Sequence, residues 1–123
     1  MILLDTSILI DYYRNKDKKN TLLFKLSQTH IFSISVITKY ELFAGTKPEK
    51  IPFTLSIIQN MKVLELSEKC IDIGIEIFNE LKSKNQIIEV PDIFIAATSI
   101  HYDLPIATLN KNHFQRITNL QII

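Results

Sequence analysis

The chain has 123 residues, enough for one domain with a substantial core and too few for two ordinary domains. Apolar residues make up 46% and charged residues 22%, which is typical of a globular protein and excludes a disordered chain. The formal net charge of +1 excludes recognition of a polyanion by overall charge, so such a ligand would need a local basic patch. Cys70 is the only cysteine, which excludes an internal disulfide and favours a reducing compartment.

The apolar start of the chain is not typical of a signal peptide or a membrane span. Asp5 and Asp11 interrupt it, no basic region precedes it, and no later apolar run reaches spanning length without a polar interruption. We therefore expect a soluble cytoplasmic protein made of a single domain over residues 1–123, with no membrane partner.

Predicted strands and helices alternate along the chain. Residues 1–4 form a continuous apolar run, the pattern of a strand buried on both faces. The predicted elements, in order, are this strand, a helix starting at 5–7, helix 20–28, strand 31–35, helix 36–44, helix 48–60, strand 62–66, a long helix capped by Ser67, helix 93–102 opened by Pro91 or Asp92, strand 105–109 and strand 120–123.

Two of these helices have a predicted buried face. The helix after Ser67 is expected to turn inward Cys70, Ile71, Gly74, Ile77, Phe78 and Leu81. The helix at 36–44 is expected to bury Val36, Ile37, Tyr40, Phe43 and Ala44, with Glu41 at the margin.

The alternation predicts an α/β fold with a mostly parallel sheet and helices on both faces. In such sheets the ligand site lies beyond the carboxyl ends of the strands. Asp5 ends the first predicted strand, residues 108–110 end the fourth, and Glu41 lies in the helix after the second. The predicted fold therefore brings these polar residues to one edge.

Four polar positions from distant segments are the candidate site residues: Asp5, Glu41, Asp92 and Asn110. The three acids are embedded in apolar sequence, where an uncompensated carboxylate is costly. Carboxylates gathered from distant segments are the usual ligands of hard cations such as Mg²⁺. This pattern favours metal-dependent phosphoryl chemistry.

Each of these residues also has a purely structural interpretation. Asp5 and Asp92 stand where helices begin and could be helix caps. Glu41 could be a surface residue, and Asn110 could be a turn residue after the fourth strand. Arg14–Lys19 is interpreted as a solvated loop between two helices, and four further polar residues are interpreted as solvated surface rather than RNA contacts: Asn20, Lys39, Lys47 and Lys50.

The segments LLDTSILID, ITKYELFAG, PDIFIAATSI and ATLNKNHFQRI resemble, in order and spacing, the four signature blocks of PIN-domain ribonucleases. The closest likeness is to the VapC-type toxin of bacterial and archaeal toxin–antitoxin pairs, and it covers essentially the whole chain. The resemblance implies a three-layer α/β/α sandwich, a homodimer, an RNA substrate and an inhibitory antitoxin.

The resemblance also implies site roles. Asp5, Glu41 and Asp92 match the catalytic acids of a site that depends on Mg²⁺ or Mn²⁺, with Asp5 and Asp92 expected to hold the ion. Asn110 departs from the pattern, because many relatives carry a fourth acid in this block. Small polar residues beside the acids are expected to contact substrate: Thr6, Ser7 and Thr108.

Two alternatives fit poorly. A phosphorylated receiver domain would need adjacent acids after the first strand and an Asp at the end of the central one, and the chain offers neither; a phosphatase with an Asp-x-Asp pair would need an acid where Ser7 stands. A PIN-like RNA- or protein-binding module whose nuclease site has decayed is suggested by Asn110. No Ser/His/Asp grouping is visible, and the three histidines, expected to be structural or exposed, have no partner that can be inferred: His30, His101 and His113.

Overall fold

The computed structural model describes residues 1–123 and is built around a four-stranded parallel sheet. The strands are β1 (Ile2–Leu4), β2 (Phe32–Ser35), β3 (Lys62–Leu64) and β4 (Ile106–Ala107), in the spatial order β3-β2-β1-β4. An isolated parallel bridge from Ile122 to Ile106 adds one more segment beside β4. The parallel sheet predicted from the alternation of elements is confirmed.

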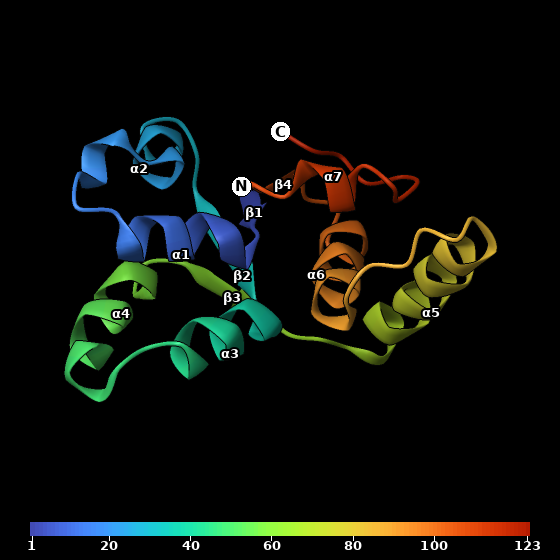
Figure 1. Ribbon diagram of the computed structural model, residues 1–123, viewed down its shortest axis with the longest axis horizontal. Helices are drawn as coiled ribbons and strands as arrows, with labels where there is room; N and C mark the ends of the chain where they lie inside the picture. The colour runs from blue at the N-terminus through green and yellow to red at the C-terminus, as the bar shows by residue number, and fades with distance from the viewer.

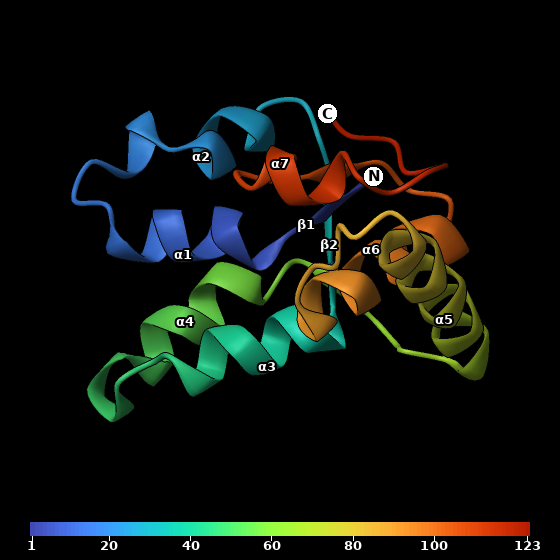
Figure 2. The ribbon, with the colours of Figure 1, turned by 45° about the vertical axis from the view of Figure 1, so that its right-hand side comes forward.

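Helices cover both faces of this sheet, which makes three layers (Figures 1 and 2). One face carries α1 to α4 and the other α5 to α7, as the two core clusters show. The bounds are α1 (Thr6–Arg14), α2 (Leu22–Ser27), α3 (Val36–Ala44), α4 (Ile51–Ile58), α5 (Glu68–Ser83), α6 (Val90–His101) and α7 (Lys111–Phe114), with 3-10 turns η1 (Lys18–Asn20) and η2 (Pro48–Lys50).

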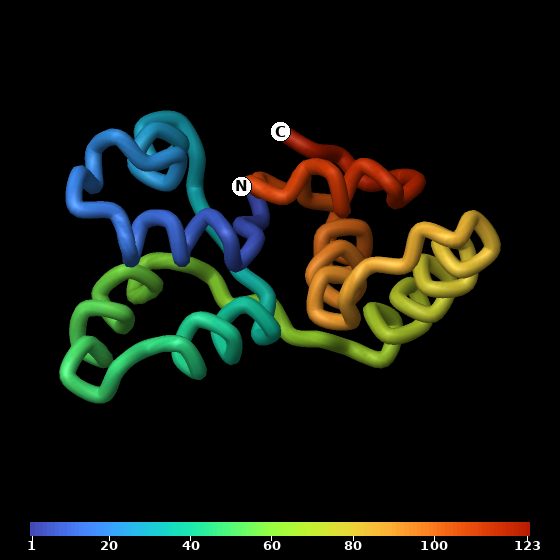
Figure 3. Tube along the Cα trace, viewed as in Figure 1, coloured from blue at the N-terminus to red at the C-terminus, as the bar shows by residue number.

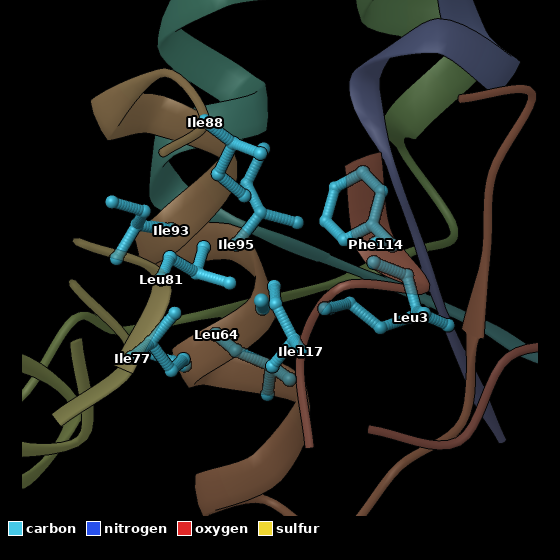
Figure 4. Close-up of a cluster of buried hydrophobic side chains, with 12 residues drawn as sticks. Leu3, Leu64, Ile77, Leu81, Ile88, Ile93, Ile95, Phe114 and Ile117 are labelled. Atoms are coloured by element: carbon cyan, nitrogen blue, oxygen red, sulfur yellow. The ribbon is translucent and has the colours of Figure 1, made fainter. Parts of the chain in front are cut away.

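The central strand β1 explains why there are two cores. Successive side chains of a strand point to opposite faces. Ile2 and Leu4 accordingly belong to the cluster under α1 to α4, while Leu3 belongs to the cluster under α5 to α7 (Figure 4). All three are almost completely buried, as expected for a strand that is apolar throughout.

Several element boundaries differ from those predicted. Helix 20–28 is shorter, because Asn20 belongs to η1 and the Thr21 side chain caps α2 by accepting from the Phe24 N–H. Helix 48–60 divides into η2 and α4, with Pro52 in the first turn of α4, where its missing N–H leaves no hydrogen bond unmade. Strand 105–109 narrows to Ile106–Ala107, and strand 120–123 is reduced to the bridge at Ile122.

The predicted buried face of α3 is wrong in part. Tyr40 is 73% exposed and Ala44 is also exposed, whereas Thr38 and Leu42 are the buried residues of the helix. The Thr38 hydroxyl contacts Thr6 of α1, which turns this face of the helix toward α1. Glu41 lies one helical turn from Thr38 and is therefore beside the buried face. On α5, Phe78 is likewise exposed rather than inward.

The two chain ends lie near each other on one side of the molecule (Figure 3). None of the helices combines the length and apolar character needed to cross a membrane.

Candidate active site

The carboxyl ends of β1 and β4 bring Asp5 and Thr108 together. The two strands pair in parallel, and the Asp5 N–H donates to the carbonyl oxygen of Ala107 (2.9 Å). Asp5 and Thr108 therefore each follow the last residue of their strand at the same edge. Since β1 also pairs with β2, α3 begins at this edge and carries Glu41 nearby.

The Asp5 carboxylate is held by two hydroxyl groups. Its Oδ2 atom accepts hydrogen bonds from Ser7 Oγ (2.7 Å) and Thr108 Oγ1 (2.8 Å). Asp5 occupies the N-cap position of α1, yet its side chain makes no capping hydrogen bond. Helix capping therefore does not explain this carboxylate, which is only 2% exposed.

Backbone groups orient both hydroxyls. The Leu109 N–H donates to Ser7 Oγ (3.1 Å), and the Asn110 N–H donates to Thr108 Oγ1 (2.9 Å). Each hydroxyl oxygen thus accepts from the backbone while its hydrogen is given to Asp5. The loop after β4 fixes Asp5 through these two side chains.

The other oxygen of Asp5, Oδ1, reaches the protein surface. Oδ1 has no hydrogen-bond partner, and every fully buried side-chain oxygen in the protein has one. It follows that Oδ1 is the carboxylate oxygen that reaches the surface. Asp5 therefore offers one free oxygen at the edge of the sheet, backed by a second oxygen that is fixed.

Glu41 is positioned by α1. Thr6 Oγ1 donates to Glu41 Oε1 (2.7 Å), and a second hydrogen bond joins Thr6 Oγ1 and Thr38 Oγ1 (3.0 Å). Glu41 is partly buried and is not a free surface residue. The hydroxyls of the three residues predicted to contact substrate therefore bind the acids: Thr6 binds Glu41, and Ser7 and Thr108 bind Asp5. Contact of these residues with substrate stays a prediction.

Asp92 lies in the first turn of α6, without acting as its N-cap, which is Glu89. Burial raises the pKa of Asp92, and the negative charges of Asp5 and Glu41 raise it further; the hydrogen bond and charge of His113 act in the opposite direction. The three predicted acids therefore act on one another electrostatically. Bringing a further negative charge here is unfavourable, and bringing a cation is favourable.

His113 is a site neighbour that sequence reasoning did not find. Its Nδ1 atom lies 3.4 Å from Asp92 Oδ2, and its side chain is 44% exposed, so the expectation of a structural or exposed histidine missed this contact. The only signal for it was its place three residues after Asn110 in the same family-like segment. Its partner is 21 residues away and becomes a neighbour only because α7 packs on α6.

Asn110 lies at the edge of this group. It is exposed, occupies the N-cap position of α7 without a side-chain capping bond, and contacts Thr108 through its backbone N–H. Its side chain forms no hydrogen bond with Asp5, Glu41 or Asp92. A contact between Asn110 and a metal stays a prediction.

The donor chemistry of the site suits a hard cation. No group of three or more histidine, cysteine, aspartate or glutamate side chains is arranged to hold a metal ion by itself. Magnesium, however, keeps several waters and commonly takes only one or two carboxylates from a protein. Two residues fit that requirement: Asp5, with its free Oδ1, and Asp92, whose negative charge is disfavoured by burial and by the charges of Asp5 and Glu41.

Residues 2–120 match the family model described as PIN domain. Ribonuclease VapC1 of Methanocaldococcus jannaschii is 32% identical over 117 residues, which make up 94% of this chain and 80% of that protein.

Solved structures with a similar fold cover the whole chain. VapBC-1 from nontypeable Haemophilus influenzae has a TM-score of 0.84 and 29% sequence identity, with 100% of this chain and 97% of that chain covered. VapBC2 from Rickettsia felis, solved bound to a DNA fragment from its promoter, has a TM-score of 0.83 and 28% identity, with 100% and 98% covered. The three-layer fold implied by the sequence resemblance is confirmed.

Proposed function

Because this chain belongs to the PIN-domain family, we propose that it is a metal-dependent ribonuclease, a single PIN-like domain over residues 1–123 that serves as the toxin of a toxin–antitoxin pair. The observation that carries the proposal is the joint placement of the acids. Asp5 has one oxygen fixed and one at the protein surface, and the charges of Asp5 and Glu41 act on Asp92. The relatives support an RNA substrate and an antitoxin, because one is named a ribonuclease and others were solved as VapBC complexes.

In this proposal Asp5 and Asp92 hold a Mg²⁺ or Mn²⁺ ion, and Glu41 and Asn110 complete the catalytic set. When bound, such an ion polarises phosphoryl oxygens and lowers the pKa of a bound water. Glu41 is held by Thr6 and partly buried, so it can accept a proton from an attacking water at a fixed position. Ser7 and Thr108 keep Asp5 from rotating away from the reacting phosphate.

Substitutions of the two ligands test the enzyme proposal. Asp5→Asn and Asp92→Asn each remove charge at nearly constant volume, so both variants should stay folded and lose RNA cleavage. Cleavage by the wild-type protein should stop on chelation and return with Mg²⁺ or Mn²⁺. Undiminished cleavage by both variants would refute the site. A folded wild-type protein that binds RNA but never cleaves it would favour the decayed module.

An apolar hollow of about 340 Å³ supports a protein partner. Side chains of α1, α2, α4 and the start of β2 line it, among them Tyr12, Phe24, Phe32 and Ile57. An amphipathic segment of an antitoxin can bury its apolar face in such a groove. Expression of this chain alone should arrest growth, and co-expression of its antitoxin should relieve the arrest. Harmless expression of folded protein would count against the toxin proposal.

A homodimer acting in the cytoplasm, where its RNA substrate is found, completes the proposal. Outside the acid cluster, three helices expose large apolar side chains: Tyr40 (73%) on α3, Ile75 (53%) and Phe78 (38%) on α5, and Val90 (60%) on α6. A second copy would remove such surface from water. Sedimentation equilibrium should give twice the mass of one chain, and a single-chain mass at micromolar concentration would contradict it.

A further inference from the structure

A second hollow lies beside the C-terminal end of α1. It has a volume of about 360 Å³ and is lined by five residues, three of which are basic and two aromatic: Tyr13, Lys18, Lys47, Lys50 and Phe53. No acidic side chain lines it. We call these five residues the basic cleft.

Internal contacts hold the floor of the basic cleft in place. Lys18 Nζ donates to the carbonyl oxygens of Tyr12 and Tyr13, at the end of α1 where such oxygens lack helical partners. The same atom lies 5.2 Å from the ring centroid of Phe53, and the rings of Tyr13 and Phe53 are 5.9 Å apart. The aromatic surface is therefore formed before any ligand arrives.

The two remaining lysines have no internal partner. Lys47 and Lys50 are exposed, and neither takes part in an ion pair; the protein's two ion pairs are Lys84–Glu80 and His113–Asp92. Two uncompensated ammonium groups thus flank a fixed aromatic surface. This combination suits a nucleotide, whose phosphate attracts lysine and whose base stacks on aromatic rings.

The distance between the basic cleft and the acids suggests where along an RNA strand the bound nucleotide would lie. Asp5 precedes the first residue of α1, and Tyr13 lies near the end of this helix. At the usual helical rise the two residues are separated by about 12 Å along the helix axis. Figure 1 shows α4, which carries Phe53, beside this end of α1. A single strand cut at the acids would reach the basic cleft within a few nucleotides.

We propose that the basic cleft anchors a nucleotide of the single-stranded RNA substrate, flanking the bond that is cut. Lys47 and Lys50 contact its phosphates, and Tyr13 and Phe53 stack against its base. This inference rests on the proposed ribonuclease function and adds a substrate site to it.

The test measures binding of a fluorescent single-stranded RNA of mixed sequence by anisotropy, in EDTA so that no cleavage occurs. The double variant Lys47→Gln/Lys50→Gln is compared with Lys62→Gln/Lys69→Gln, which removes the same charge from exposed lysines outside the basic cleft. Two lost phosphate contacts should weaken binding about tenfold near 0.15 M salt and lower the slope of log K against log salt by about 1.4. The control should keep the wild-type slope.

A separate variant tests stacking. Tyr13→Leu should weaken RNA binding and leave the salt slope unchanged, because it removes a ring and no charge. In cleavage assays the lysine double variant should raise KM and leave kcat unchanged, since the basic cleft lies away from the reacting phosphate. Circular dichroism checks that each variant is folded.

The outcomes separate the two proposals. If wild-type protein cleaves RNA but both lysine pairs behave alike, the basic cleft is refuted and the ribonuclease stands. If the lysine double variant binds RNA normally but escapes its antitoxin, the basic cleft contacts protein and the inference is overturned. If wild-type protein neither binds nor cleaves any RNA, both proposals fail.

Discussion

Thr108→Val is the sharpest test of how the acid cluster is held. Thr108 is 2% exposed and donates a hydrogen bond of 2.8 Å to Asp5 Oδ2. Valine keeps the shape and removes the hydroxyl. A hydrogen bond to a charged group contributes about 1.5–3 kcal/mol, so the variant should lower the free energy of unfolding by about 2 kcal/mol. The Asn110 N–H that also loses its acceptor is in an exposed residue and can turn to water at little cost.

Thr98→Val is the matched control. Thr98 is completely buried, and its hydroxyl donates to the carbonyl oxygen of Phe94 (2.8 Å), a neutral acceptor. Its loss should cost about 1 kcal/mol, because neutral hydrogen bonds contribute about half as much as charged ones. Urea unfolding at pH 7 in EDTA measures both. If Thr108→Val costs no more than Thr98→Val, Thr108 does not hold a charged carboxylate. Thr108→Val should also bind Mg²⁺ more weakly than the wild-type protein in calorimetry, and Thr108→Ser should restore the affinity.

Three further predictions concern the same molecule. Because the pKa of Asp92 is raised in the folded state, folding favours its protonated form, and the free energy of unfolding should fall as pH rises from about 3.9 through the folded pKa. Asp92→Asn should flatten that fall and be more stable than the wild-type protein at pH 7. Urea unfolding that gives the two proteins the same dependence of the free energy of unfolding on pH would contradict the raised pKa. Asn110→Asp should tighten Mg²⁺ binding by about 1 kcal/mol in calorimetry, the scale of one added charge in a partly solvated site; equal affinities would leave Asn110 as a turn residue. Phe24→Asp, in the apolar hollow, should keep RNA cleavage and abolish restraint by the antitoxin in a growth assay; retained restraint would exclude the hollow as the docking surface.

The sequence by itself determined the local elements and the edge at which the acids meet. The unbroken apolar run of β1 is typical of a strand buried on both faces, and parallel strands joined by helices have their carboxyl ends at one edge. Asp5 and Thr108 therefore had to be neighbours once β1 and β4 were adjacent. These features follow from periodicity, which depends on residues close together in the chain.

Only the tertiary structure decided which side chain each acid contacts. Thr108 and Asp5 are separated by 103 residues, and Asp92 and His113 by 21, so their hydrogen bonds depend on strand register and on how α7 packs on α6. The orientation of α3 was decided in the same way: the apolar pattern places Tyr40 on the buried face, but Tyr40 is 73% exposed, and Thr38, which is hydrogen-bonded to Thr6, is buried instead. Apolar burial depends on area and not on direction, whereas a hydrogen bond needs its partner within a few tenths of an ångström. A sequence pattern therefore predicts that a helix is covered, and only the assembled fold determines what covers it.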